Sequence, residues 1–148
     1  MNILETIPFQ PNQAIVFDID DTLISTTTGQ CITEVCNLYN HCRKKGYTIY
    51  IITARGGTPY GMNFTIKQLQ HCGINGYKKV FFRPPATLNI SLYKKNARKS
   101  IPETVVMSVG DQAWDIGEYG GAGVLVQPPR VQSYPSMIGN FFGRLIFN

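Results

Sequence analysis

Three aspartates follow directly after a run of apolar and β-branched residues near the start of the chain. They are Asp18, Asp20 and Asp21 in the segment "AIVFDIDDTLIS", residues 14–25. Carboxylates gathered in one place repel one another unless protons or a cation lie between them, and oxygen ligands without a neighbouring His or Cys favour magnesium. The segment therefore predicts a Mg²⁺ site at the end of a buried strand.

Polar groups of other kinds follow or precede the later apolar runs. They are Thr53 and Arg55 in "IITAR", Lys94 in "LYKKNARK", and Asp111 and Asp115 in "GDQAWD". We expect Asp18 and Asp111 to be the side-chain ligands of the metal. A magnesium ion beside a lysine and a hydroxyl forms a site for a phosphoryl group, because the two cations neutralise its oxygens while the hydroxyl donates a hydrogen bond.

Asp18 and Asp20 have the spacing of a nucleophile and an acid–base group. A carboxylate can attack phosphorus and form an aspartyl-phosphate, which water then hydrolyses. A second carboxyl two residues further along an extended chain points to the same side, where it can protonate the leaving oxygen and later activate the water. The pair therefore predicts a phosphatase that acts through an aspartyl-phosphate.

Alternating strands and helices must bring these groups together. Continuously apolar runs predict buried parallel strands at residues 14–19, 47–52, 79–82, 104–109 and 123–126. Apolar faces at helical spacing predict helices over 31–45 and 62–72, which Gly46 and Gly73 would end. The alternation predicts an α/β fold in one domain, residues 1–148: a three-layer, doubly wound, Rossmann-like parallel sheet with helices on both faces. In such a fold the ligand crevice lies at the carboxyl ends of the strands.

The motifs resemble those of the haloacid dehalogenase-like superfamily of phosphohydrolases, in the same order along the chain. "FDIDDTLI" resembles the DxDx[TV] first motif, "IITAR" the second, Lys94 the third and "GDQAWD" the fourth. The acid-phosphatase branch is similar in further segments, namely "IITARGG", "RPP" at 83–85, "LYKKNAR", "SVGDQAWDIGEYGG" and "QPP" at 127–129. The resemblance covers about residues 14–130.

This resemblance implies a role for each matching residue. Asp18 would be the nucleophile, and Asp20 the acid–base group and a metal ligand through its main-chain carbonyl. Thr53 and Lys94 would bind the phosphate. The resemblance therefore adds named roles to the same phosphatase chemistry that the residue types predict.

The remaining positions are open to more than one interpretation. The resemblance implies that Asp111 is a metal ligand and that Asp115 supports or completes the metal site, although Asp115 could equally be a helix N-terminal charge. Lys95 is the main rival of Lys94, but one step round a helix turns it about 100° away. Contacts to the substrate are expected from Asp21, Thr22 and Arg55.

The spacing of the motifs leaves no room for a large cap domain. Only 32 residues separate Asp20 from Thr53, and 40 separate Thr53 from Lys94. An uncapped cleft is open to bulky ligands. We therefore expect the phosphate to be carried by a nucleotide, a nucleic-acid end or a protein, or a partner subunit to complete the site. A nucleotide or polynucleotide 3′-phosphatase is the alternative activity.

Alternatives of another class are a phosphoacceptor signalling module and a non-catalytic phosphate-binding protein. Receiver modules also combine aspartates, a Thr and a Lys around magnesium, but their phosphorylated Asp ends a middle strand, whereas the DxD motif here ends the first. All motif residues are present, which counts against a binding protein that has lost its activity. Both alternatives are therefore less favoured than an enzyme.

Composition limits the remaining possibilities. The 148 residues carry a net charge of +5, with a pI of about 9.1, which suits an anionic partner. The four cysteines form no CxxC pair, Cys36 and Cys42 fall on the apolar face of a helix, and no stretch is a signal peptide or a membrane span. These features predict a cytoplasmic protein. A helix over 137–146 is expected to pack on the domain, with a contact between two copies of the chain or a helix on a membrane surface as the alternatives.

Overall fold

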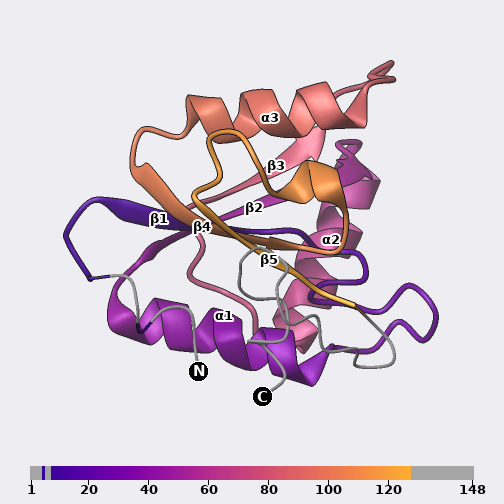
Figure 1. Cartoon of the computed structure of the whole chain (residues 1–148). Coiled ribbons are helices and arrows are strands. Elements are labelled where there is room, and N and C mark those ends of the chain that lie inside the picture. Colours follow the sequence, from indigo (N-terminus) through magenta and orange to yellow (C-terminus); the bar gives the residue numbers. More distant parts are fainter. Residues whose placement is uncertain (1–4, 6–7, 128–148) are drawn as a thin grey trace.

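The structure is a computed structural model that describes residue 5 and residues 8–127. In this part of the chain, strands alternate with helices as the sequence predicts, and the strands form one parallel sheet in the order β3-β2-β1-β4-β5 (Figure 1). The elements are β1 (Gln13–Phe17), α1 (Thr33–Lys45), β2 (Thr48–Gly56), α2 (Pro59–His71), β3 (Lys79–Arg83), α3 (Ile90–Ser100), β4 (Thr104–Gly110), the 3-10 helix η2 (Ala113–Asp115) and β5 (Ala122–Leu125). The fold class is therefore the predicted three-layer, Rossmann-like α/β fold.

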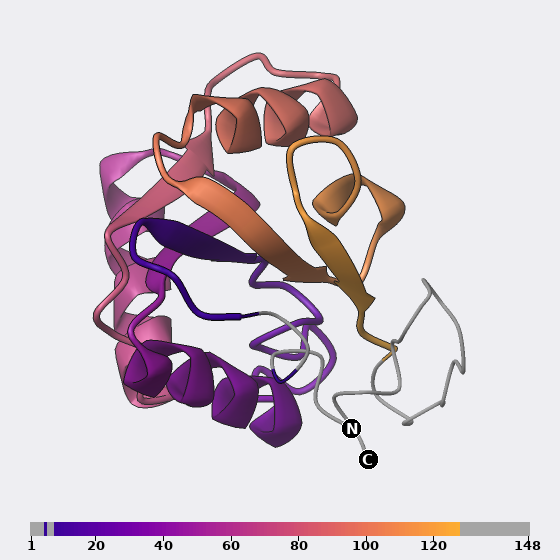
Figure 2. The same cartoon turned by 60° about the vertical axis from the view of Figure 1, so that its left-hand side comes forward.

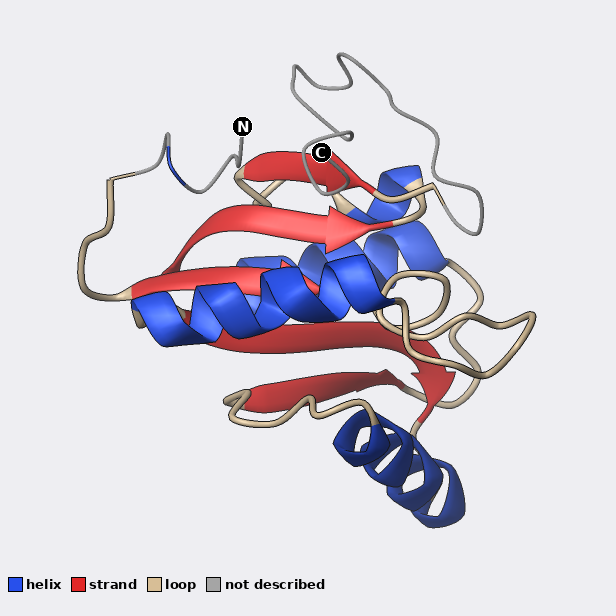
Figure 3. Ribbon diagram, turned by 90° about the horizontal axis from the view of Figure 1, so that it is seen from below, coloured by secondary structure: helices blue, strands red, loops and turns tan. Residues whose placement is uncertain are grey.

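Helices cover both faces of the sheet. Figures 2 and 3 show α1 and α2 on one face and α3 on the other. On the first face Val35, Tyr39 and Leu69 pack against Ile15 and other residues of the central strands, and on the second face Ala97 of α3 packs in a separate cluster. Because β1 lies between β2 and β4 and is covered on both faces, its sequence is apolar at consecutive positions rather than at alternate ones.

The helix ends follow from local sequence. Gly46 ends α1 with a φ of 98°, a left-handed conformation that glycine adopts without steric cost. Thr58 caps α2, because its Oγ1 accepts the Gly61 N–H at 3.1 Å, and Pro59 fits the first helical turn. These two residues explain why α2 begins three residues before the predicted start at 62.

Helix α3 has a buried face that is largely polar. Its buried residues are Lys94, Ala97 and Arg98. A search for apolar residues at helical spacing therefore detects α1 and α2 but not α3. Asn89 caps α3 by accepting the Leu92 N–H at 2.9 Å.

The described chain adds no cap domain to the sheet. The loop from Asp20 to Ile32 folds into a short hairpin, in which Ile24 bridges to both Asp20 and Cys31. The rest of that interval is α1 and the start of β2. The prediction that no large cap is present is therefore confirmed for the residues that the structure describes.

Two of the four cysteines form a disulfide that the sequence interpretation did not foresee. Cys31 and Cys72 are bonded, with their Cα atoms 5.6 Å apart, whereas Cys36 and Cys42 are free and buried in α1 as expected. Because Cys31 ends the hairpin after Asp20 and Cys72 follows α2, the bond ties this hairpin to the layer of helices. The sequence predicted no structural role for Cys31 or Cys72.

Two further predictions concern the helix expected near the C-terminal end and the absence of a membrane-spanning helix. The expected helix over 137–146, and any contact between copies through it, lies outside the described residues. None of the helices in the described residues has the length and apolar character needed to cross a bilayer.

Candidate active site

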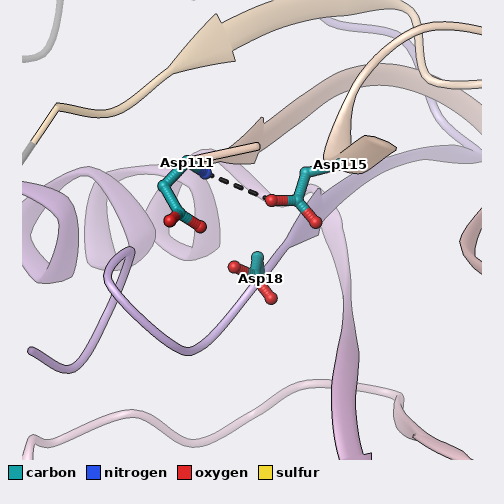
Figure 4. A group of neighbouring side chains, drawn as sticks. All are labelled: Asp18, Asp111 and Asp115. Atoms are coloured by element: carbon teal, nitrogen blue, oxygen red, sulfur yellow. Dashed lines mark hydrogen bonds between the residues drawn. The ribbon is translucent and has the colours of Figure 1, made fainter. Parts of the chain in front are cut away.

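Three carboxylates meet where β1 and β4 end (Figure 4). Asp18 directly follows β1 and continues its pairing, because its N–H donates to the Val109 carbonyl at 3.0 Å. Asp111 directly follows β4, and Asp115 ends η2. One oxygen from each of Asp18, Asp111 and Asp115 lies within 4.8 Å of the other two. The strand order explains this, since β1 and β4 are neighbours in the sheet.

Lys94 lies between two of these carboxylates. Its Nζ is 2.8 Å from Asp18 Oδ1 and 2.5 Å from Asp115 Oδ1, and the residue is only 2% exposed. Lys95 instead points to the surface, where its Nζ is 3.4 Å from Glu118 Oε1. Of the two lysines that the sequence left open, Lys94 is therefore the one at the carboxylate cluster.

Asp115 is held by the turn that carries it. Its Oδ2 accepts the N–H of Asp111 at 3.2 Å and that of Gln112 at 3.0 Å, while its Oδ1 contacts Lys94. A side chain at Gly110 would overlap the Asp115 side chain, so the close turn requires glycine there. Asp115 thus holds the turn and orients Lys94, which is a positioning role, and one of its oxygens also lies close enough to Asp18 and Asp111 to complete a metal site.

Burial shifts the titration of the cluster. It raises the pKa of Asp18 from 3.8 to about 6, against the opposing effect of Lys94, and it raises the pKa of Asp115 to about 6, with Asp18 adding to the rise. The pKa of Asp111 is also raised, mainly by burial. Burial alone would lower the pKa of Lys94, but Asp18 and Asp115 together raise it. Three carboxylates beside one ammonium leave excess negative charge, which a hard cation would neutralise.

The chemistry of the donors fits magnesium. Asp18 and Asp111 are linked through Thr22, whose Oγ1 lies 3.2 Å from Asp18 Oδ2 and 3.5 Å from Asp111 Oδ1. Among the described residues no hydrogen bond ends on the main-chain carbonyl of Asp20, which leaves that oxygen free for a metal. Such a set consists of oxygen atoms alone, as magnesium prefers.

Asp20 is oriented by Arg55. Arg55 Nη2 donates to Asp20 Oδ1 at 2.8 Å and Nε donates to Oδ2 at 3.1 Å, while Nη1 donates to Thr65 Oγ1 and Gln68 Oε1 on α2. The guanidinium is thus engaged by protein groups on all three nitrogens. The predicted role of Arg55 as a substrate contact is therefore not the one that these contacts favour, since they make it a positioning residue for Asp20.

Two threonines and one aspartate beside the cluster, Thr22, Thr53 and Asp21, have different surroundings. Thr22 is fully buried and donates to the nucleophile candidate Asp18, so it does not face a substrate. Thr53 ends the buried part of β2, and among the described residues its hydroxyl only accepts, from the Arg55 N–H at 3.1 Å. Its hydrogen is therefore free for a phosphate oxygen. Asp21 accepts from Thr26 and holds the hairpin in shape, with a φ of 58°.

A cavity of about 340 Å³ opens beside the cluster. Its lining combines the hairpin after β1 with the ends of β4 and β5, and consists of Asp21, Ser25, Thr27, Asp111, Gln112, Val126 and Gln127. The lining is mostly polar and contains Asp111. The cavity therefore adjoins the cluster at Asp111 and is not lined by Lys94, and Asp21 remains a candidate substrate contact.

Two further residues at the site escaped the sequence interpretation. Arg98, one helical turn after Lys94, is 4% exposed and donates to the carbonyls of Glu118 and Trp114, which flank the turn holding Asp115. The Tyr93 hydroxyl contacts the Thr53 carbonyl at 2.8 Å and the Phe81 carbonyl at 2.9 Å. The spacing of Lys94 and Arg98 was the available signal, because residues four apart share a helix face.

One protein family matches most of the chain. The family described as HAD superfamily, subfamily IIIB (Acid phosphatase) matches residues 27–130. The matched residues include Thr53, Lys94 and Asp111 but begin after Asp18 and Asp20. No curated protein sequence matches the chain.

Solved structures with the same fold include three proteins of low sequence identity. A chain of the Pnkp1/Rnl/Hen1 complex has a TM-score of 0.62 and 16% identity, over 70% of this chain and 40% of that chain. The D,D-heptose 1.7-bisphosphate phosphatase from B. bronchiseptica, complexed with magnesium and phosphate, has a TM-score of 0.57 and 16% identity, over 78% of this chain and 80% of that chain. The class C acid phosphatase from Bacillus anthracis, with tungstate bound, has a TM-score of 0.52 and 17% identity, over 77% of this chain and 57% of that chain. At these identities the likeness concerns the fold, and this chain spans 40% of the first of the three.

Proposed function

The chain belongs to subfamily IIIB of the HAD superfamily, the acid phosphatases, and from this premise we propose that it is a magnesium-dependent phosphatase acting through an aspartyl-phosphate. That it is a phosphomonoesterase follows from the family; the metal, the intermediate and the residue roles are the proposal. The observation that carries it is the buried contact of Lys94 with Asp18 and Asp115, where three carboxylates meet at the carboxyl edge of the sheet.

Asp18 is the proposed nucleophile. With a pKa of about 6 it is ionised at neutral pH, and Lys94 and Thr22 fix its two oxygens. One oxygen of Asp18 forms a bond to phosphorus while the bond from phosphorus to the leaving oxygen breaks. Because the family match begins after Asp18, this role rests on the contacts of the side chain rather than on the match.

Asp20 is the proposed acid–base group. Its proton passes to the leaving oxygen in the first step, and in the second step it accepts a proton from the water that attacks the aspartyl-phosphate. The paired contacts from Arg55 support this role, because they fix the direction of the carboxyl group without excluding it from the cleft, where its side chain is 38% exposed.

Thr53 and Lys94 are the proposed phosphate ligands. The Thr53 hydroxyl donates to one phosphoryl oxygen, and the Lys94 ammonium stabilises the negative charge that builds up on the others. A magnesium ion held by Asp18, Asp111 and the Asp20 carbonyl would neutralise further charge on the phosphate. The all-oxygen donor set supports magnesium, as does the magnesium in the heptose bisphosphate phosphatase of the same fold.

The substrate is proposed to be a phosphomonoester on a bulky carrier. The absence of a cap in the described residues supports this, since nothing there closes over the cleft. A polynucleotide 3′-phosphatase remains the alternative activity, supported by the likeness in fold to a chain of the Pnkp1/Rnl/Hen1 complex.

The proposal includes a cytoplasmic location, and the disulfide bears directly on it. Disulfides persist most readily in oxidising compartments, and Cys31 is bonded to Cys72. A count of free thiols in protein isolated without reductant tests this point. Four free thiols would favour a reducing compartment, and two would contradict it.

Turnover of p-nitrophenyl phosphate with and without magnesium tests the activity. We expect repeated turnover that stops when EDTA removes the metal and returns when magnesium is added. A phosphoacceptor module would release at most one equivalent of p-nitrophenol, and a binding protein none. Either result would overturn the proposal.

A further inference from the structure

Arg83 lies at the carboxyl edge of the sheet, where it reaches across the end of a neighbouring strand. It is the last residue of β3, and β3 pairs with β2 so that Arg83 lies opposite Gly56. Its Nε donates to the Ala54 carbonyl at 2.7 Å, and its Nη1 donates to the Thr87 carbonyl at 3.1 Å. One carbonyl in β2 and one in the loop before α3 therefore fix the guanidinium in a half-buried position.

The charge of Arg83 is not neutralised by any carboxylate side chain. All nine acidic residues of the sequence are among the described residues, and none of them forms an ion pair with Arg83. By contrast, Arg55 and Lys94 at this edge each lie within 2.8 Å of an aspartate oxygen. Arg98 also donates to carbonyls, but it is only 4% exposed and so is closed off from a ligand. Carbonyl groups orient a guanidinium without cancelling its charge. Arg83 is thus a positioned cation that remains able to bind an anion.

Arg83 lies beside the proposed phosphate site without being part of it. Its acceptor Ala54 directly follows Thr53, and the Thr53 carbonyl in turn contacts the Tyr93 hydroxyl. The pKa of Tyr93 is raised, mainly by burial. The charge of Arg83 opposes this rise, and the charge of Asp18 adds to it. Both charges are therefore close enough to act on the same hydroxyl.

The positive end of a helix lies next to Arg83. Helix α2 starts at Pro59, and a Cβ at Gly57, just before it, would lie 3.2 Å from Phe82 Cβ and 3.9 Å from the Arg83 carbonyl. The loop into α2 thus packs directly on the end of β3. The N-terminus of a helix attracts anions, so an anion bound at this end of β3 would lie in a favourable field.

We propose that Arg83, beside the amino end of α2, binds a second phosphate group of the substrate while the first phosphate lies against Asp18. This rests on the proposed function. Parallel strands are about 4.8 Å apart and β2 separates β1 from β3, so β3 lies about 10 Å to the side of β1. Phe17 and Val80 are both paired with Ile51, so Arg83 lies three residues, about 10 Å, beyond the level at which β1 ends. A long arginine side chain shortens that gap. The site therefore suits a carrier with a second phosphate near the first, such as a nucleic-acid end whose terminal phosphate is followed by a phosphodiester. A preference for a small bisphosphate would keep the second phosphate site and show that the carrier need not be bulky.

The test compares substrates that differ only in a second phosphate. One pair is hexyl phosphate and hexanediol bisphosphate, and the other is thymidine 3′-monophosphate and a 3′-phosphorylated oligothymidylate. We expect the wild type to favour the second member of at least one pair in kcat/KM by about tenfold to a hundredfold, the range of one charge-assisted hydrogen bond. The pair that shows the preference identifies the carrier. No preference in either pair would overturn the inference.

Arg83→Gln should reduce this preference at least about tenfold, mainly through KM. Arg43→Gln is the matched control, because Arg43 is also unpaired with any carboxylate but lies at the far end of α1. It should keep the wild-type preference. An equal loss on both members of a pair would instead mean that Arg83 only supports Thr53, and would contradict the proposal.

A second variant and a binding measurement cover the remaining outcomes. If Arg83→Gln is too unstable to assay, Arg83→Lys takes its place. Arg83→Lys keeps the charge and should therefore retain part of the substrate preference. Complete loss of the preference in Arg83→Lys, at a normal melting temperature, would contradict a role for the charge. Binding of each pair to Asp18→Asn, measured by calorimetry, does not require turnover. If the preference persists there while the wild type shows no phosphatase activity, the proposed function fails but the second anion site stands.

Discussion

The side of the sheet covered by α1 and α2 is packed with apolar side chains, whereas the side covered by α3 buries charges. On the first side Ile15, Phe17, Tyr39 and Leu69 are completely buried within one large cluster. On the second side a small apolar cluster shares α3 with Lys94 and Arg98, which are 2% and 4% exposed. The same sheet therefore has one side suited to stability and one suited to chemistry.

The difference has an energetic reason. Burying apolar area stabilises the fold by roughly 25 cal/mol per Å², whereas a buried ion pair contributes little net stability, because both charges lose their hydration. The apolar burial under α1 and α2 therefore offsets the free energy lost when charges are buried under α3. Substitutions on the first side should alter stability alone, and substitutions around α3 should alter activity first.

The largest effect is expected for Asp18→Asn, which removes the nucleophile but keeps the shape of the side chain. We expect kcat to fall by about a thousandfold or more, because an amide is a poor nucleophile. Steady-state kinetics with p-nitrophenyl phosphate measures it, with Glu118→Gln as a surface control. Activity within tenfold of wild type would exclude Asp18 as the nucleophile.

Leu69→Ala, on the opposite side, should lower the free energy of unfolding by about 2–5 kcal/mol, because it leaves a cavity in the apolar cluster. The kcat of the protein that remains folded should stay within about twofold of wild type. Urea denaturation and kinetics on the same preparation measure both quantities. Leu92→Ala is a suitable control, because Leu92 on α3 is 48% exposed. A large drop in kcat for Leu69→Ala would break the division between the two sides.

Lys94→Ala should lower kcat/KM about a hundredfold or more, the scale of losing one preorganised charge beside the transition state. Lys95→Ala should change kcat/KM little, because its charge is exposed and screened by salt. Kinetics on the two neighbouring variants sharpen the comparison within one helix. A severe defect confined to Lys95→Ala would contradict the assignment of Lys94.

The smallest effect is expected for the pH dependence of the stability of the metal-free protein. Because the folded pKa of Asp18 is raised to about 6, its contribution to stability is complete below the unfolded value of 3.8 and is lost as pH rises through about 6. In EDTA, the free energy of unfolding of Asp18→Asn should therefore rise by about 1–3 kcal/mol relative to that of the wild type between pH 4 and pH 7. Thermal melts across that range measure the difference. A difference that does not change with pH would show that burial does not strain this carboxylate.

The sequence predicted the strands and the residues at their ends more fully than the contacts between those residues. Strand ends were readable because apolar runs stop at Asp18, Thr53 and Asp111. The pairing of Arg55 with Asp20 was not readable, because it depends on how β2 and the hairpin after β1 lie in space. The disulfide was missed for the same reason, since nothing in the spacing of Cys31 and Cys72 indicates that the hairpin reaches the end of α2. Helix α3 carries no apolar stripe because its buried face is occupied by the cations of the site.

The position of β1 in the middle of the sheet has a consequence for how the protein is made. One edge of β1 pairs with β2, which follows it closely in the sequence, but the other pairs with β4, beginning at Thr104. At a synthesis rate of about 5–20 residues per second, several seconds separate the two strands. During that time β1 has an unpaired edge, which is open to pairing with another chain. The strand that carries the nucleophile is thus a free sheet edge in the nascent chain until β4 leaves the ribosome, so faults in early folding should fall on the catalytic strand.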